Sequence, residues 1–254
     1  SLGKTNTPEF GAGSQTFNQV FGATKNPYDL SKTCGGSSGG AAVSVACRML
    51  PFADGSDLGG SLRNPTNFCN VVGFRPSVGR VPSWPIEAGW DSFAVDGPIA
   101  RTVEDTALLL SVLAGPDLRS PICLPENGTI FQQSLERNLK GIRIAWSSDL
   151  GGLPVDSRVT ETLEKQREVF EDLGCIVEEG FPDFTDADEI FKTFRVWYFE
   201  LKLASLLPEH REKMKETVIW NIESGMKLSG PELGRAEAVS YTHLRAHETL
   251  MNLV

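Results

Sequence analysis

The 254-residue sequence lacks several features that mark common binding classes. It has no run of 18 or more apolar residues, so no transmembrane helix can be read from it. It has neither a Gly-x-Gly-x-x-Gly segment before a helix nor a Gly-Lys-Ser/Thr segment, which argues against a nucleotide-phosphate loop. Lys and Arg number 24 against 33 Asp and Glu, and the net charge of −9 argues against nucleic acid or an anionic membrane as the main partner.

Cysteine and histidine are also scarce. The five cysteines are an odd number without a Cys-x-x-Cys pair, which favours reduced, mostly buried thiols in a cytoplasmic protein over a disulfide or zinc framework. Only three histidines occur, and two of them, His243 and His247, lie in a segment (239–249) that looks like the translation of a sequencing adapter. The third, His210, is on a charged segment far from any serine motif, so a Ser–His–Asp triad and a His-rich metal site are both disfavoured.

Two glycine-rich loops that carry serine flank an apolar segment of helix length. The first loop is Gly35-Gly36-Ser37-Ser38-Gly39-Gly40, the second runs from Gly55 to Arg63, and residues 41–50 lie between them. Glycine permits positive φ, and successive free N–H groups in such turns form an anion-binding concavity. A serine hydroxyl in that concavity can attack a carbonyl whose oxyanion the same N–H groups then stabilise.

Two other interpretations of these loops are open. The glycines can simply form tight turns, one of them at the start of the helix, or the loops can cradle a phosphate. Cys34 stands next to the first loop but has no motif that supports it as a nucleophile. The serine pair of each loop, together with Asp57 and Arg63 on either side of Ser61, favours the catalytic interpretation.

At these residues the chain resembles the amidase signature family of serine hydrolases. The resemblance is close over residues 2–115 and continues loosely to about residue 238. Besides the two loops it includes several short segments: Gly3-Lys4-Thr5-Asn6, Phe21-Gly22, Asn26-Pro27, Val72-Gly73-Phe74-Arg75-Pro76, Gly79-Arg80-Val81 and Asp96-Gly97-Pro98-Ile99-Ala100-Arg101. It implies an α/β fold of the amidase-signature type, with a mixed β-sheet core covered by α-helices on both faces.

The resemblance also implies a Ser–Ser–Lys triad. Ser61 matches the family's nucleophile, and Ser37 matches its bridging serine, which follows a cis peptide bond. The oxyanion hole is matched by the backbone amides of Leu58, Gly59, Gly60 and Ser61. Ser38, Asp57 and Arg63 match supporting positions that hold the loops, and no metal site is implied.

The lysine of the triad has no match in the chain. In the family it lies several tens of residues before the Gly-Lys-Thr-Asn segment, and here only Ser1 and Leu2 precede that segment. Lys4 belongs to this other motif and does not substitute for it. The sequence is therefore expected to be a nearly inactive fragment, with residues 1–238 forming a partial amidase signature domain and residues 239–254 a non-native tail.

The function implied is hydrolysis of a carboxamide C–N bond through an acyl-enzyme, with a small-molecule amide as substrate and no cofactor. The alternatives are the amidase subunit of a glutamyl-tRNA amidotransferase, a carbamate or ester hydrolase, and a non-catalytic anion-binding module. No nucleic-acid or membrane partner is expected, and a homodimer is left open.

The chain pattern predicts the main elements. Helices are expected at 41–49, 102–114 and 156–173, and the second of these has a cap at Thr102 and a stop at Gly115-Pro116. A fourth helix is expected in a later segment, where Ile190, Phe194, Trp197 and Leu201 recur at helical spacing and form a stripe that faces the core. Strands are expected at 51–53, 71–74, 141–146 and 175–178. The strand–helix–strand order between 141 and 178 predicts parallel pairing. The apolar face of the helix at 156–173 is expected to comprise Val159, Leu163, Phe170 and Leu173.

Overall fold

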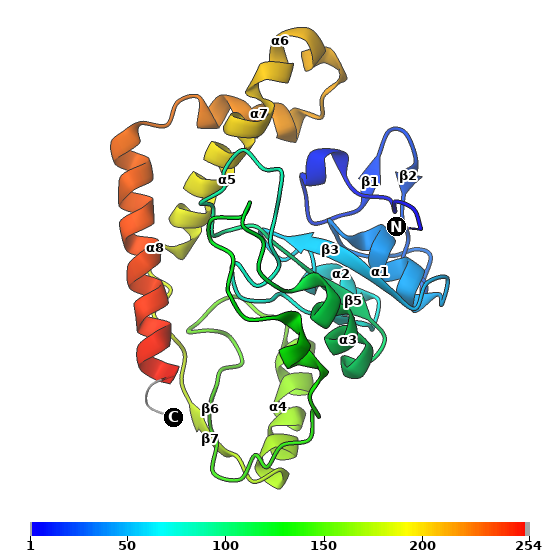
Figure 1. Cartoon of the computed structure of the whole chain (residues 1–254), viewed down its shortest axis with the longest axis vertical. Coiled ribbons are helices and arrows are strands. Elements are labelled where there is room, and N and C mark those ends of the chain that lie inside the picture. Colours follow the sequence, from blue (N-terminus) through cyan, green and yellow to red (C-terminus); the bar gives the residue numbers. More distant parts are fainter. Residues whose placement is uncertain (1, 252–254) are drawn as a thin grey trace. The chain divides into compact units, whose positions relative to one another are not determined.

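The computed structural model describes the backbone of residues 2–251 and the side chains up to residue 241, so the side chains of His243 and His247 lie outside it (Figure 1). The chain forms two compact units. The first comprises Ser1–Leu135 and Tyr198–Met226, and the second comprises Glu136–Trp197 and Lys227–Val254. None of the described helices is long and apolar enough to cross a membrane.

A three-stranded antiparallel sheet forms the centre of the first unit, in the order β3-β5-β4. These strands are β3 (Phe52–Asp57), β5 (Val95–Ala100) and β4 (Val72–Gly73). The β3–β5 register runs from Phe52 opposite Ala100 to Asp57 opposite Val95. Helices α1 (Gly39–Ala46) and α3 (Val103–Leu113) both pack against β3 and β5. Ala41, Val45, Leu62 and Ile99 form the buried core beneath α1.

The predicted elements around this sheet are confirmed with shifted bounds. Helix α1 starts directly after Ser38, two residues earlier than expected, and its small side chains let it pack closely. Thr102 caps α3 by accepting a hydrogen bond from Asp105 N–H at 3.1 Å. The strand expected at 51–53 was too short, because β3 continues through Gly55 to Asp57. Gly55 lies opposite Gly97 on β5, so the strand pair passes through residues that the sequence suggested were loop.

The remainder of the first unit consists of short elements, some of which surround a second core. They are η1 (Glu9–Gly11), β1 (Phe17–Asn18), β2 (Gly22–Ala23), α2 (Arg63–Phe68), η2 (Gly128–Gln132), η3 (Ala204–Leu206), α6 (Leu207–His210), η4 (Arg211–Lys213) and α7 (Glu216–Gly225). This core joins the segment after η1 to α7 and to the end of α5 (Ala187–Leu203), through Ala12, Phe199, Leu203, Val218 and Ile222.

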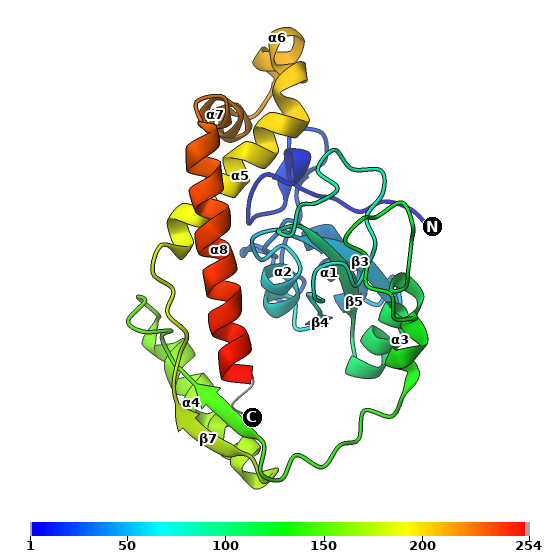
Figure 2. The ribbon, with the colours of Figure 1, turned by 60° about the vertical axis from the view of Figure 1, so that its left-hand side comes forward.

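The second unit contains the predicted strand–helix–strand. Strands β6 (Arg143–Trp146) and β7 (Ile176–Glu179) pair in parallel, as expected. Helix α4 (Ser157–Asp172) connects them and packs against β7 (Figure 2). Asp156 caps α4 by accepting from Arg158 N–H at 2.9 Å, and Gly174 ends it with a φ of 86°. Helix α8 (Gly230–Met251) completes this unit.

The predicted apolar faces of two helices were partly wrong. In α5, Ile190 and Phe194 are buried as expected, but Leu201 is 41% exposed. The last turns of α5 instead bury Val196, Phe199 and Leu203, about half a helical turn away, and Phe199 and Leu203 belong to the core of the first unit. No residue of α4 is buried, since a pair of four-residue strands is too small to cover a 16-residue helix. Phe170 makes an edge-to-face contact with Trp146 there, with ring centroids 5.9 Å apart.

Candidate active site

The two glycine–serine loops meet at the end of β3. Ser38 N–H donates to the Ser61 carbonyl at 3.2 Å, and Ser38 Oγ accepts from Ser56 N–H at 3.3 Å. Ser37 is buried, whereas Ser61 is partly exposed. The structure therefore places both predicted catalytic serines on adjoining loops, with Ser38 joining the loops through its backbone and its side chain.

Thr16 fastens the first loop. The Gly36–Ser37 peptide bond is cis, as the resemblance implied. The buried Thr16 hydroxyl donates to the Gly35 carbonyl at 2.9 Å and accepts from Gly39 N–H at 3.1 Å. A Cβ at Gly39 would lie only 2.2 Å from Thr16 Oγ1, so glycine is required at this close approach. No sequence signal pointed to Thr16, because a lone threonine in a distant loop matches no motif.

Asp57 organises the second loop. Its side chain is fully buried and lies at the end of β3. Oδ1 accepts from Gly60 N–H at 2.7 Å, and Oδ2 accepts from Leu62 N–H at 3.2 Å. The Arg63 guanidinium makes a bidentate pair with the carboxylate, with both N···O distances at 3.0 Å. The predicted supporting pair of Asp57 and Arg63 is thus in direct contact.

Arg75 is a further partner of Asp57 to which the sequence assigned no role. Its Nη1 lies 3.1 Å from Asp57 Oδ1 and also donates to the Asp57 carbonyl, while Nη2 donates to the Phe93 carbonyl at 2.9 Å. Arg75 stood within one of the segments that carry the resemblance, and this was the available signal. Its contact with Asp57 spans 18 residues of sequence, so spacing did not reveal it.

The two guanidinium groups keep Asp57 ionised. Burial by itself would raise the pKa of the Asp57 carboxyl. The hydrogen bonds from Arg63 and Gly60 N–H, with the positive charges of Arg63 and Arg75, outweigh that effect and hold the pKa below its usual value. A buried, charged acceptor therefore fixes the backbone on either side of Ser61.

The amides around Ser61 divide into two groups. The N–H groups of Leu58, Gly59 and Ser61 donate to no residue that the structure describes. Gly60 N–H, the fourth amide expected in the oxyanion hole, donates to Asp57 instead, and Gly60 has a φ of 108°. Successive N–H groups at a turn that have no partner among the described residues are the kind of donors that can hold an oxyanion.

The serine hydroxyls are not joined into a relay within the described part of the chain. Neither Ser37 Oγ nor Ser61 Oγ has a hydrogen-bond partner among residues 2–241, so no lysine of that range is hydrogen-bonded to them. Ser37 Oγ lies beside Gly11, where a Cβ would be 4.0 Å from it. The geometry brings the two loops together, and within the described range both hydroxyls are without a hydrogen-bond partner.

Cys34 lacks the environment of a reactive thiolate. It is buried, and burial raises the pKa of its thiol. Among the residues described, no cluster of His, Cys, Asp and Glu has the arrangement of a metal site. The chemistry available at the loops is that of hydroxyls and backbone amides.

Comparison with known proteins identifies the family. The sequence profile of the family named Amidase matches residues 1–229. The chain belongs to the amidase signature family. An acylamidase from Rhodococcus erythropolis is 36% identical over 254 residues, which cover 99% of this chain and 53% of that protein. One component of the glutamyl-tRNA(Gln) amidotransferase of Lactiplantibacillus plantarum is 40% identical over 178 residues, or 70% of this chain and 37% of that one.

Solved structures confirm the α/β fold of the amidase signature family. A bacterial aryl acylamidase of the family has a TM-score of 0.90 and 30% identity, covering 98% of this chain and 54% of its own. The corresponding component of the glutamyl-tRNA(Gln) amidotransferase from Thermotoga maritima has a TM-score of 0.65 and 28% identity, covering 97% and 50%. The chain spans about half the length of the relatives that match most of it.

Proposed function

We propose that the complete protein is an amidase in which Ser61 attacks the carbonyl carbon of a small carboxamide. The observation that carries this proposal is the turn at Ser61, where the amides of Leu58, Gly59 and Ser61 have no hydrogen-bond partner among the described residues. Buried Asp57 holds this turn through Gly60 and Leu62. Preorganised N–H donors of this kind supply much of the catalysis in acyl transfer.

The reaction proceeds in two half-reactions. Ser61 Oγ bonds to the carbonyl carbon, its proton passes to Ser37 Oγ, and the Ser37 proton passes to the family's catalytic lysine, which no described residue matches. The negative oxygen of the tetrahedral intermediate accepts hydrogen bonds from the loop amides. The C–N bond then breaks, the amine leaves with a proton returned through Ser37, and an ester to Ser61 remains. A water molecule then attacks the carbonyl carbon of that ester while its proton passes to Ser37. Ser61 Oγ leaves with a proton returned through Ser37, and the acid is released.

The comparisons favour a stand-alone amidase. The structural similarity to the aryl acylamidase is higher than that to the amidotransferase component, with TM-scores of 0.90 and 0.65. The second candidate, an amidotransferase component that passes ammonia to a partner, is supported by 40% identity over 70% of the chain. Carbamates and esters are further substrates that the same acyl-transfer chemistry accepts.

We further propose that the protein works in a reducing compartment such as the cytoplasm. All five cysteines, Cys34, Cys47, Cys69, Cys123 and Cys175, are free thiols in the structure. Disulfides are rare where glutathione and thioredoxin keep thiols reduced.

The test is substrate turnover by the complete protein encoded by the gene. We expect Ser61→Ala and Ser37→Ala each to lower kcat on an anilide by about 10⁴-fold or more, because members of a triad act as a unit. Ser44→Ala is the matched control: this buried serine of α1 donates only to the Ala41 carbonyl of its own helix, and we expect it to keep wild-type turnover.

Each alternative predicts a different result. Preferred turnover of glutamine with a co-purifying partner protein would identify an amidotransferase. Full anilide hydrolysis by Ser61→Ala would refute the proposed nucleophile. Tight phosphate binding that survives Ser61→Ala, without any hydrolysis by the wild type, would indicate an anion-binding module.

A further inference from the structure

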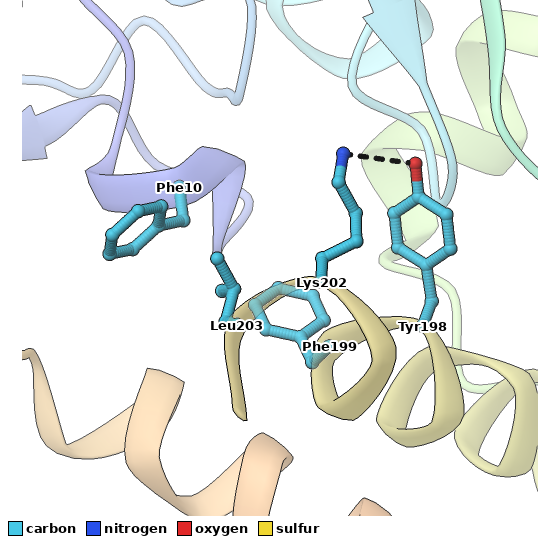
Figure 3. Close-up of a pocket in the computed structure, with 5 residues that line it drawn as sticks. All are labelled: Phe10, Tyr198, Phe199, Lys202 and Leu203. Carbon is cyan, nitrogen blue, oxygen red and sulfur yellow. Dashed lines mark hydrogen bonds between the residues drawn. The ribbon is translucent and has the colours of Figure 1, made fainter. Parts of the chain in front are cut away.

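A pocket of about 210 Å³ lies between η1 and the end of α5, both in the first unit (Figure 3). It is lined by Phe10, Tyr198, Phe199, Lys202 and Leu203. Sites that enclose a whole drug-sized ligand measure about 300–1,000 Å³. This pocket therefore suits one part of a ligand, such as a single substituted ring.

The Phe10 side of the pocket adjoins Ser37. Phe10 precedes Gly11, at which a Cβ would lie 4.0 Å from Ser37 Oγ. Two hydrogen bonds from Lys215 hold this segment: its backbone N–H donates to Glu9 Oε1 at 2.8 Å, and its Nζ donates to the Ala12 carbonyl at 3.3 Å. These bonds hold the backbone on either side of Gly11, the residue that lies beside Ser37 Oγ.

The Lys202 side is connected to the same loops through β5. Burial raises the pKa of Asp96 on this strand, and the hydrogen bond from Ser83 and the positive charge of Lys202 act in the opposite direction. Asp96 lies opposite Ser56 in the β3–β5 register, and Ser56 N–H donates to Ser38 Oγ.

Lys202 gives this aromatic pocket one charged end. Its Nζ donates to the Tyr198 hydroxyl at 3.3 Å and lies 4.9 Å from the Tyr198 ring centroid. No carboxylate of the described residues lies within 4.0 Å of Nζ. An ammonium has three N–H donors, so two of them remain for a ligand.

We propose that this pocket is the specificity subsite of the amidase and binds an aromatic ring that bears a carboxylate or another hydrogen-bond acceptor, with Lys202 receiving that group. The ring packs against Phe10, Phe199 and Leu203, and Tyr198 holds the ammonium in place. This assignment rests on the proposed amide hydrolysis, because it concerns which amides reach Ser61.

The test measures binding separately from catalysis. The complete protein with Ser61→Ala keeps amides intact, so dissociation constants can be measured by calorimetry for paired probes: 4-carboxybenzamide against 4-methylbenzamide, and 4-acetamidobenzoate against 4-methylacetanilide. We expect Lys202→Met to weaken the carboxylate member of at least one pair by about tenfold or more, and to leave both methyl members within about twofold, because only a charge-assisted hydrogen bond is lost.

Three further variants control the interpretation. Tyr198→Phe removes the hydroxyl that holds Lys202, and we expect it to weaken the same carboxylate probe by a smaller factor. Phe10→Ala, at an exposed ring outside the core clusters, should weaken carboxylate and methyl probes alike. Lys192→Met removes a lysine of the same helix that pairs with Asp188, and binding should not change.

Failure of the subsite and failure of the amidase proposal give different results. Equal effects of Lys202→Met on both members of each pair, or no effect on any probe, would overturn the subsite even if Ser61→Ala abolishes hydrolysis. Selective loss of carboxylate binding in Lys202→Met would support the subsite even if Ser61→Ala hydrolyses amides normally, and in that case the proposed nucleophile would be wrong.

Discussion

Replacing Asp57 by asparagine tests how far the stability and activity of the site depend on one buried negative charge. The two carboxylate oxygens of Asp57 accept hydrogen bonds from the amides of Gly60, Leu62 and Arg63 and from the guanidinium groups of Arg63 and Arg75. Asparagine has the same shape but only one acceptor oxygen. Its NH₂ group must therefore face donors that have lost their partner, and the negative charge between the two arginines disappears.

The size of the effect follows from burial. Removing one partner of a buried ion pair costs about 3–5 kcal/mol. The Asp57 side chain is fully buried, but that of Arg63 is 57% exposed, so water replaces part of the lost interaction. We expect the free energy of unfolding to fall by about 3 kcal/mol. Because Gly60 and Leu62 set the turn at Ser61, kcat should also fall, by about 10²–10³-fold, as when an oxyanion donor is lost.

The assay pairs urea unfolding, followed by circular dichroism, with anilide turnover of the complete protein. Asp54→Asn is the matched control, since Asp54 is an exposed residue of the same strand, and it should change the free energy of unfolding by less than about 0.5 kcal/mol. If Asp57→Asn changed neither quantity more than Asp54→Asn does, the role assigned to Asp57 would be refuted.

Three further predictions concern the ionisation of Asp57, the close approach at Gly39 and the buried cysteines. The pKa of Asp57 in the folded protein lies below the unfolded value of about 3.9. The stabilisation by its carboxylate is therefore complete above that pH and is lost as the pH falls toward the folded pKa. In acid titrations, the difference in free energy of unfolding between wild type and Asp57→Asn should become smaller below about pH 4. Gly39→Ala should lower the free energy of unfolding by about 1–3 kcal/mol in the urea assay, because the new Cβ would collide with Thr16 Oγ1. Gly3→Ala is the control, since Gly3 has open space around it, and it should leave the free energy of unfolding unchanged. Iodoacetamide should label exposed Cys47 in the native protein, but Cys34 and Cys69 only after unfolding. Cys34 and Cys69 are both buried, and burial raises the pKa of Cys69 to about 12. Labelling of Cys69 in the native protein, detected by mass spectrometry, would contradict this prediction.

Features set by neighbouring residues were predictable from the sequence. The cap at Thr102 was expected, and Asp156 and Gly174 stand at the ends of the helix that was expected at 156–173. These features depend on hydrogen bonds or φ angles within a few residues. The parallel pairing of β6 and β7 followed from the strand–helix–strand order. The two serine loops stood out because their glycines and serines recur within short spacings.

Features set by distant contacts were missed. Thr16 reaches the first loop from about 20 residues away, and Arg75 reaches Asp57 across 18 residues, so neither contact has a local pattern. The extension of β3 through Gly55 depends on pairing with Gly97, which overrides the weak strand preference of glycine. The buried face changes along α5 from Ile190 and Phe194 to Phe199 and Leu203, and a single helical period does not encode this.

The central claim is that Ser61 is an activated nucleophile, and covalent labelling tests it most directly. The complete protein would be treated with a serine-reactive fluorophosphonate, and the adduct located by mass spectrometry, with heat-denatured protein as the control for reactivity that does not require the fold. We expect an adduct on Ser61 in the native protein. We expect none on Ser61 after denaturation, and none at this position in the Ser61→Ala variant. A folded protein with no adduct on Ser61, or with one on another serine, would contradict it.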